Sequence, residues 1–250
     1  MLTPERRRGV EILDDPSQDP MLAVRSLRDV ALANRLFGGR RAIIVELRHL
    51  IRRGLRDRAA SDRATRQRTP TSQIAITVLD VGTGLGDIPR AAVHEADEFG
   101  LQIATIGLEV TSAIASAAAP SCTFAVVGDA TRLPFADASV DIVTCSQLLH
   151  HFDGPAADTL LRECTRVARM GVVVGDLRRS WLAVAGLWSV SFLLGFHPVS
   201  RHDGVVSILR GFTKEELRRL VRRATGTRVL VRRRFAWRVT AVWIPGKSIE

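Results

Sequence analysis

The sequence is poor in several residue types, and each shortage narrows what the protein can be. It has no tyrosine, two lysines and three cysteines, Cys122, Cys145 and Cys164. The cysteines are too few for a disulfide framework and too far apart for a close-spaced metal site. We therefore expect reduced, mostly buried thiols in a cytoplasmic protein, and we assign no residue as a metal ligand.

Hydrophobic runs are short. Residues 1–15 carry charge where a secretory signal needs an apolar core, so we do not expect secretion. Residues 181–196 form a run of 16 apolar or small residues, which falls short of the roughly 18 to 20 that span a bilayer. We interpret this run as a buried helix, as a wall of an apolar substrate pocket, or as a patch that transiently contacts a membrane surface.

The positive charge is unevenly distributed. The net charge is +10, and residues 40–68 hold ten arginines against Glu46, Asp57 and Asp62. Such a block binds nucleic acid or an anionic surface in some proteins and is a solvated helical face in many others. Aromatic residues make up 5% of the chain, and no aromatic-rich RNA-binding module is evident. We therefore favour the solvated face and do not expect a nucleic-acid partner.

The hydrophobic periodicity changes along the chain. Residues 21–37 and 41–51 have the spacing of amphipathic helices, and a polar stretch at 58–73 is typical of a linker. We expect a helical lid and linker over residues 1–70 and one further domain over residues 71–250. Strands are expected at residues 74–81, 103–109, 123–127, 140–146 and 171–177, with helices between most of them, which is typical of a parallel sheet covered on both faces.

The C-terminal part has its own local signals. Thr213 followed by Glu216 forms a capping-box pattern at the start of a helix over residues 213–224. Two strand-like segments, at about 228–234 and 236–244, are close enough to form a hairpin.

Polar residues follow the predicted strands at their carboxyl ends, where ligands of such sheets bind. The first strand ends in Asp80 and a glycine turn, the second in Glu109, the third in Asp129, and the fourth in Ser146 and Gln147. The glycine turn departs from the dinucleotide pattern, because its third glycine comes one residue early. An acceptor-rich cleft of this kind suits hydroxyls, an exocyclic amine and a cation better than a phosphate. Either aspartate alone could instead be an ordinary turn residue.

Four segments occur in the order of a known family: "VLDVGTGLGDIP", the acidic end of "IATIGLEV", "GDATRLPFADASVDIVTCSQLLHHF" and "LLRECTRVARMGVVVGDL". Over about residues 74–180 the chain resembles the class I S-adenosylmethionine-dependent methyltransferases, in their ubiquinone/menaquinone-biosynthesis-like branch. The resemblance implies an α/β, Rossmann-like, doubly wound seven-stranded sheet with an antiparallel last strand, here preceded by the helical lid. It also implies S-adenosylmethionine as the cofactor.

The resemblance implies roles for particular residues. Asp80 would lie near the methionine ammonium, Glu109 would accept the two ribose hydroxyls, and Asp129 would accept the adenine amino group. Glu109 stands where the family usually has Asp. The implied cofactor-binding set is Asp80, Gly82, Thr83, Gly84, Gly86, Glu109, Val110, Asp129, Ala130, Ser146 and Gln147.

The acceptor is expected to meet an insert at residues 178–212, where members of the family commonly place substrate-binding elements. Its apolar run favours a small, phenolic or polyketide-like acceptor of secondary metabolism and O-methylation. The predicted substrate-binding residues are Arg178, Trp181, His197 and Arg201. An RNA-modifying methyltransferase and a non-catalytic binding protein on the same fold are the alternatives.

A hydroxyl acceptor needs a base, and the absence of tyrosine leaves His, Asp and Glu. We predict His151 as the catalytic base, with His202 as the second candidate. Successive helical residues point about 100° apart, so His150 and His151 are not expected to face the cleft together.

Overall fold

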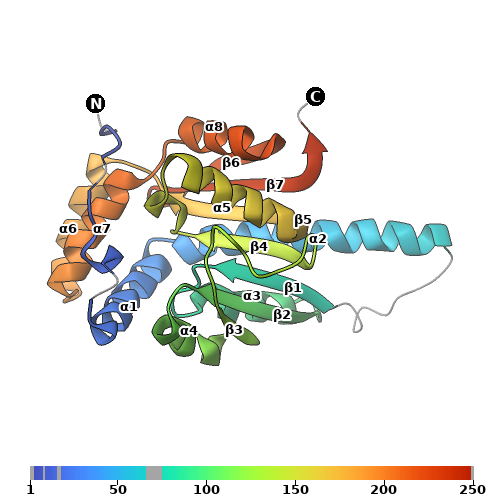
Figure 1. Cartoon of the computed structure of the whole chain (residues 1–250), viewed down its shortest axis with the longest axis horizontal. Coiled ribbons are helices and arrows are strands. Elements are labelled where there is room, and N and C mark those ends of the chain that lie inside the picture. Colours follow the sequence, from blue (N-terminus) through green and yellow to red (C-terminus); the bar gives the residue numbers. More distant parts are fainter. Residues whose placement is uncertain (1–2, 8, 16–17, 66–74, 249–250) are drawn as a thin grey trace.

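The computed structural model describes residues 3–7, 9–15, 18–65 and 75–248. Within these residues seven strands form one sheet in the order β3-β2-β1-β4-β5-β7-β6 (Figure 1). The strands are β1 (Ala75–Val81), β2 (Gln102–Glu109), β3 (Phe124–Val127), β4 (Val140–Ser146), β5 (Ala168–Leu177), β6 (Thr227–Arg234) and β7 (Arg238–Ser248). Strands β1 to β5 pair in parallel, and β7 runs antiparallel to both β5 and β6. The predicted seven-stranded sheet with an antiparallel last strand is confirmed.

Helices cover both faces of this sheet. They are α1 (Pro20–Leu36), α2 (Gly39–Thr65), α3 (Asp87–Asp97), α4 (Ser112–Ala118), α5 (Gly154–Val167), α6 (Trp181–Leu193), α7 (Pro198–Arg210) and α8 (Lys214–Thr225), with 3-10 turns η1 (Ile12–Asp14), η3 (Ala119–Ser121) and η4 (Leu149–His151). Alternate residues of a strand point to opposite faces. In β1, Ile76 and Val78 belong to the buried cluster that includes residues of α2 and α3, whereas Leu79 and Val81 belong to the cluster that includes residues of α5 and α8.

The predicted strand boundaries agree with the structure to within one residue for β1 to β4. Strand β5 begins at Ala168 rather than at residue 171. Arg169, a charged residue near the start of this strand, does not suggest a buried strand in the sequence. In the structure it pairs with Asp141 of β4 at 3.2 Å. The helix with the capping box and the closing hairpin are both confirmed.

The second N-terminal helix is longer than predicted. We expected a helix over residues 41–51 and a linker over 58–73, but α2 continues to Thr65. No glycine or proline follows Gly54 until Pro70, and arginine and alanine favour helix, so the helix has no local reason to end earlier. Residues 66–73 of the predicted linker lie outside the described residues.

Helices α1 and α2 have different surroundings, although we predicted one helical lid. The apolar face of α2, with Ile43, Leu47 and Ile51, is fully buried in the core beneath the sheet. One of its arginines, Arg53, pairs with Asp57 at the surface at 3.5 Å, which agrees with the solvated-face interpretation for this part of the helix. Helix α1 instead lines the cavity described below. The division of the chain at residue 70 stays a prediction.

Two composition-based expectations can be compared with the structure. Cys145 and Cys164 are buried, Cys122 is partly buried, and all three are free thiols. Across the described ranges, none of the helices combines the length and the apolar character that crossing a bilayer requires.

Candidate active site

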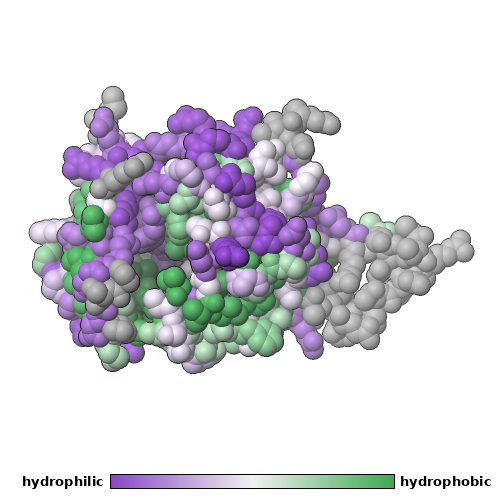
Figure 2. All heavy atoms as spheres, in the orientation of Figure 1, coloured by the Kyte–Doolittle hydropathy of each residue, from purple (hydrophilic) through white to green (hydrophobic). Residues whose placement is uncertain are grey.

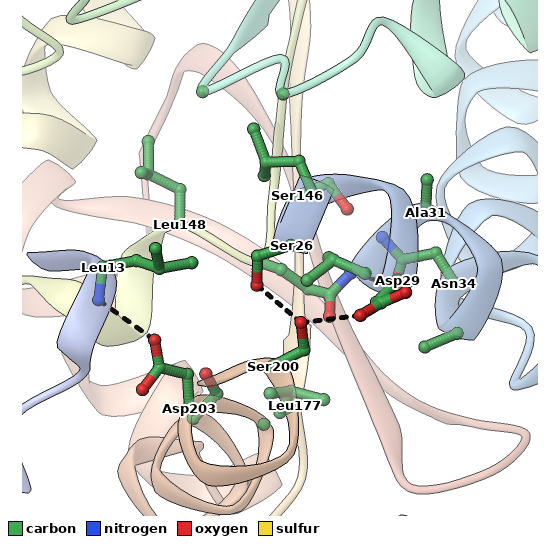
Figure 3. A pocket seen from close by; sticks show the side chains of 18 of the residues that line it. Leu13, Ser26, Asp29, Ala31, Asn34, Ser146, Leu148, Leu177, Ser200 and Asp203 are labelled. Atoms are coloured by element: carbon green, nitrogen blue, oxygen red, sulfur yellow. Dashed lines mark hydrogen bonds between the residues drawn. The ribbon is translucent and has the colours of Figure 1, made fainter. Parts of the chain in front are cut away.

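A cavity of about 380 Å³ opens at the carboxyl ends of β1, β2 and β4. Its other walls come from the segment around η1, from α1, from the inner sides of α6 and α7, and from the turn between β6 and β7. Hydrogen bonds hold α1 against α7: the Ser26 and Ser200 hydroxyls lie 2.8 Å apart, and Ser200 Oγ donates to Asp29 at 2.7 Å (Figure 3). At the strand-end position predicted for ligand binding there is therefore a cavity, walled by the sheet on one side and by helices on the other.

The glycine turn shapes one end of the cavity. Gly82 and Gly84 line it with φ values of 70° and 58°, which favour glycine. Gly86 is the N-cap of α3 and does not line the cavity among the described residues. A Cβ at Gly86 would lie 2.6 Å from Ser121 Cβ, so this glycine permits close packing of the turn.

Two buried carboxylates flank the turn. Asp80 accepts hydrogen bonds from Thr144 Oγ1 at 2.6 Å and Thr83 Oγ1 at 2.8 Å, yet burial raises its pKa to about 7. Glu109 accepts from the Gly84 N–H at 2.5 Å, and burial raises its pKa as well. Both groups are taken out of water, and none of the hydrogen bonds that they accept from described residues comes from a cationic side chain. A cationic ligand or ligand hydroxyls would favour their ionised forms.

The remaining predicted cofactor residues divide into two groups. Thr83, Val110, Ser146 and Gln147 line the cavity, and Gln147 Oε1 accepts from Arg238 at 2.9 Å. Asp129 and Ala130 do not line it in the described part of the chain. Asp129 is exposed, and its Oδ1 accepts from the N–H and hydroxyl of Thr131 at 2.7 and 2.8 Å, which is the turn role that the sequence left open. Its contact with adenine stays a proposal.

Both histidines after β4 line the cavity, so the expectation that they would not face it together was wrong. They lie in the single turn η4, and their ring centroids are 4.3 Å apart. Both side chains border the cavity from this turn. His150 Nδ1 lies 2.7 Å from Asp176 Oδ1, and His151 Nδ1 lies 2.9 Å from Asp14 Oδ1. Burial opposes protonation of His151, but Asp14 and Glu11 raise its pKa overall.

Three acidic residues and one arginine of this region were not predicted from the sequence. Glu11 and Asp14 come from the N-terminal segment, and Arg210 of α7 donates to both, at 3.1 and 2.8 Å. Nothing local in the sequence indicates that this segment crosses the mouth of the sheet. Asp176 stands at the carboxyl end of β5, so the strand-end rule that selected Asp80 could have found it.

The residues predicted to contact the substrate do not line the cavity within the described chain. The set comprises Arg178, Trp181, His197 and Arg201, together with the second candidate base, His202. His197 caps α7, the Arg201 guanidinium lies 4.2 Å from the centre of the Phe192 ring, and the side chain of His202 is 51% exposed. Other residues of the insert line the cavity. On one side of α6, Ala183, Gly186 and Leu187 point inward, whereas bulky side chains on its other side, such as Trp188 and Phe192, are exposed.

Carboxylates dominate the polar lining of the cavity. They are Glu11, Asp14, Asp29, Asp80, Asp87, Glu109 and Asp203, and the guanidinium of Arg238 faces the same space. This balance favours a cationic ligand and disfavours a phosphate. S-adenosylmethionine, with a sulfonium, an ammonium and two ribose hydroxyls, matches these groups.

Comparisons with known proteins agree with this fit. Residues 78–171 match a family model described as a methyltransferase domain. A demethylmenaquinone methyltransferase from Roseiflexus sp. (strain RS-1) is 35% identical over 118 residues, which cover 44% of this chain and 47% of the relative. The chain thus spans about half the length of that relative.

Solved structures show the same fold. The CMeT domain of the citrinin polyketide synthase has a TM-score of 0.53 at 13% identity, covering 72% of this chain and 49% of that one. A Nostoc punctiforme protein assigned as an O-methyltransferase has a TM-score of 0.50 at 16% identity, covering 67% of this chain and 51% of that one. The Rossmann-like fold of the chain is the one that these solved structures have. Residues 78–171 are thus similar to methyltransferase domains, as the motifs predicted, and S-adenosylmethionine is the cofactor that the site fits.

Proposed function

We propose that this protein transfers a methyl group from S-adenosylmethionine to a hydroxyl of a small, largely apolar acceptor of phenolic or polyketide-like chemistry. One observation supports this best: a single cavity joins the glycine turn, Asp80 and Glu109 to an apolar wall. That wall includes Leu13, Leu177, Ala183, Leu187, Phe196 and Ile208.

The chain's own residues would bind, orient and exclude water. S-adenosylmethionine supplies an activated methyl group on a sulfonium. Glu109 would hold the ribose hydroxyls and Asp80 the ammonium, while α1 and α7, joined through Ser26 and Ser200, close the site from water. Positioning of this kind provides much of the rate of a bimolecular transfer. His151, on the lining of the same cavity, is our proposal for the side chain that contacts the acceptor hydroxyl.

Two alternative functions are separated by one assay. An RNA substrate is disfavoured, because the acidic lining repels phosphate. The protein should be incubated with methyl-labelled S-adenosylmethionine and either a set of small phenols and polyketides or total tRNA. Label in the small molecules supports the proposal. Label in tRNA contradicts it, and binding of S-adenosylhomocysteine without label in either pool favours a binding protein.

The Glu109→Ala variant should bind S-adenosylhomocysteine about 1.5–3 kcal/mol more weakly than the wild type. The change removes charged hydrogen bonds to both ribose hydroxyls and leaves the Gly84 N–H without its acceptor. Isothermal titration calorimetry measures the difference, and Glu215→Ala, an exposed position on α8, is the control. Unchanged affinity in Glu109→Ala would remove this residue from the cofactor site.

We further propose that the outer face of α6 contacts a membrane surface transiently. Trp188, Phe192 and Leu193 are 58, 52 and 85% exposed, and Arg201 lies beside Phe192 (Figure 2 shows hydrophobic side chains over α6 at one edge of the molecule). This pattern of apolar and basic groups suits an anionic bilayer surface, where a lipophilic acceptor would collect.

Trp188→Asp should reduce co-sedimentation with phosphatidylglycerol vesicles at least about 10-fold. The change removes an apolar side chain that would be buried in the bilayer surface and adds a negative charge that the anionic lipid repels. Leu230→Asp on β6, which is 50% exposed in the wild type, is the matched control. Equal binding by both variants and the wild type, or no binding by the wild type, would contradict membrane contact through α6.

A further inference from the structure

Three side chains at one end of the cavity converge on a common point. Glu11, His150 and His151 each offer a ligand atom, and these atoms lie within 4.8 Å of one another. His150 Nε2 is 3.8 Å from Glu11 Oε1, and His151 Nε2 is 3.9 Å from Glu11 Oε2. These separations are too long for hydrogen bonds. They are a few tenths of an ångström longer than the roughly 3.3–3.6 Å between two ligand atoms of a tetrahedral ion with bonds of about 2.0–2.2 Å.

The second nitrogen of each imidazole is held by a carboxylate. Asp176 lies 2.7 Å from His150 Nδ1, and Asp14 lies 2.9 Å from His151 Nδ1. An Nδ1–H donated to a carboxylate leaves the Nε2 lone pair free to bind, and this is the arrangement that orients and strengthens histidine ligands at metal sites.

His150 supplies an independent indication of a ligand. The residue is 3% exposed, and its Nε2 has no hydrogen-bond partner among the described residues. A buried polar atom without a partner is costly, and such atoms are rare in folded proteins. Because His150 lines the cavity, a group bound there would satisfy this nitrogen.

The local charge also favours a cation. Glu11, Asp14 and Asp176 carry three negative charges around the two imidazoles, and Arg210 contributes one positive charge. Arg210 and Ser207 both donate to Oε1 of Glu11, at 3.1 and 2.9 Å, which leaves Oε2 directed toward His151. With neutral imidazoles the cluster retains an excess of negative charge that a divalent ion would balance.

We propose that Glu11, His150 and His151 bind a divalent transition-metal ion, for which two imidazoles and one carboxylate are a common set and Zn²⁺ is the best match. This assignment goes beyond the sequence analysis, which named no metal ligand. At this position the ion would bind the acceptor's hydroxyl oxygen and lower its pKa, so that the O–H bond breaks, the electron pair stays on oxygen and the proton passes to water. With the ion bound, His151 would act on the hydroxyl through the ion and not by direct contact. That role rests on the proposed function, whereas binding of the ion does not.

Calorimetric titration of the chelator-treated full chain with zinc chloride tests the site. We expect one zinc ion per chain in the wild type, and visible absorption when Co²⁺ replaces it. Glu11→Gln and His151→Ala should each weaken zinc binding at least about 10-fold, since even the loss of a residue that orients a ligand has that effect. His94→Ala, at an exposed position on α3, is the control for adventitious binding. Thermal melting of each variant confirms that it is folded.

Two results would overturn the site: no stoichiometric zinc binding by the wild type, or binding that Glu11→Gln and His151→Ala leave unchanged. Equal weakening by His94→Ala would indicate an adventitious ion only. Titration of the same zinc-free protein with S-adenosylhomocysteine separates the two proposals. If S-adenosylhomocysteine binds and zinc does not, the metal site fails and the labelling assay alone decides the proposed function; if zinc binds and S-adenosylhomocysteine does not, the proposed function fails and the site stands.

Discussion

The His151→Ala variant should retain its affinity for S-adenosylhomocysteine and lose at least about 10²-fold of its turnover. Its imidazole lines the cavity at the end formed by Glu11 and Asp14, whereas the proposed cofactor contacts, Asp80 and Glu109, lie at the glycine turn. Removing the ring therefore takes away a contact to the reacting hydroxyl without removing a contact to the cofactor. A methyl-transfer assay at saturating S-adenosylmethionine, combined with calorimetry, measures both quantities.

The matched control for this experiment is His94→Ala, whose side chain is exposed on α3. Near-normal turnover in His151→Ala would show that the acceptor does not depend on this imidazole. A large loss in His202→Ala instead would also contradict the proposal, because that side chain is 51% exposed and lies 2.8 Å from Asp203.

The Glu46→Ala variant should lower the free energy of unfolding of the whole chain by about 3 kcal/mol, the low end for a broken buried ion pair because Arg232 is 39% exposed. Glu46 is 1% exposed on α2 and accepts from Arg232 at 2.8 Å, Arg234 at 2.5 Å and Thr240 at 2.7 Å. These bonds join α2 to β6 and β7. Their loss leaves two partly exposed arginines without this carboxylate and the buried Thr240 hydroxyl without its acceptor.

Urea unfolding measures this effect, and Asp57→Ala is its control. Asp57 lies on the same helix, is 71% exposed and pairs with Arg53 at the surface, so its loss should change stability by less than about 1 kcal/mol. If Glu46→Ala changes stability as little as Asp57→Ala, the bonds of Glu46 do not stabilise the packing of α2 against β6 and β7.

Features that depend on neighbouring residues along the chain could be predicted from the sequence. The alternation of strands and helices, the glycine turn with Asp80, the acidic end of β2 and the capping box of α8 were all readable because each has a local pattern. The strand-end rule then predicted a common site, since parallel strands present their carboxyl ends at one edge of a sheet. Asp80 and Glu109 do line one cavity.

The other residues of that cavity are brought there by contacts between distant parts of the chain. Asp14 and His151 are 137 positions apart, and no periodicity or spacing indicates that they meet. The direction of α6 was equally hidden, because an apolar helix without a polar stripe does not reveal which side it buries, and Trp181 proved to face outward. Long-range packing therefore determines three features: the end of the cavity where carboxylates surround the two histidines, the residues of the insert that face the cavity, and the place of α2 in the core. Contacts of this kind join elements far apart in the chain, so no local sequence pattern indicates them.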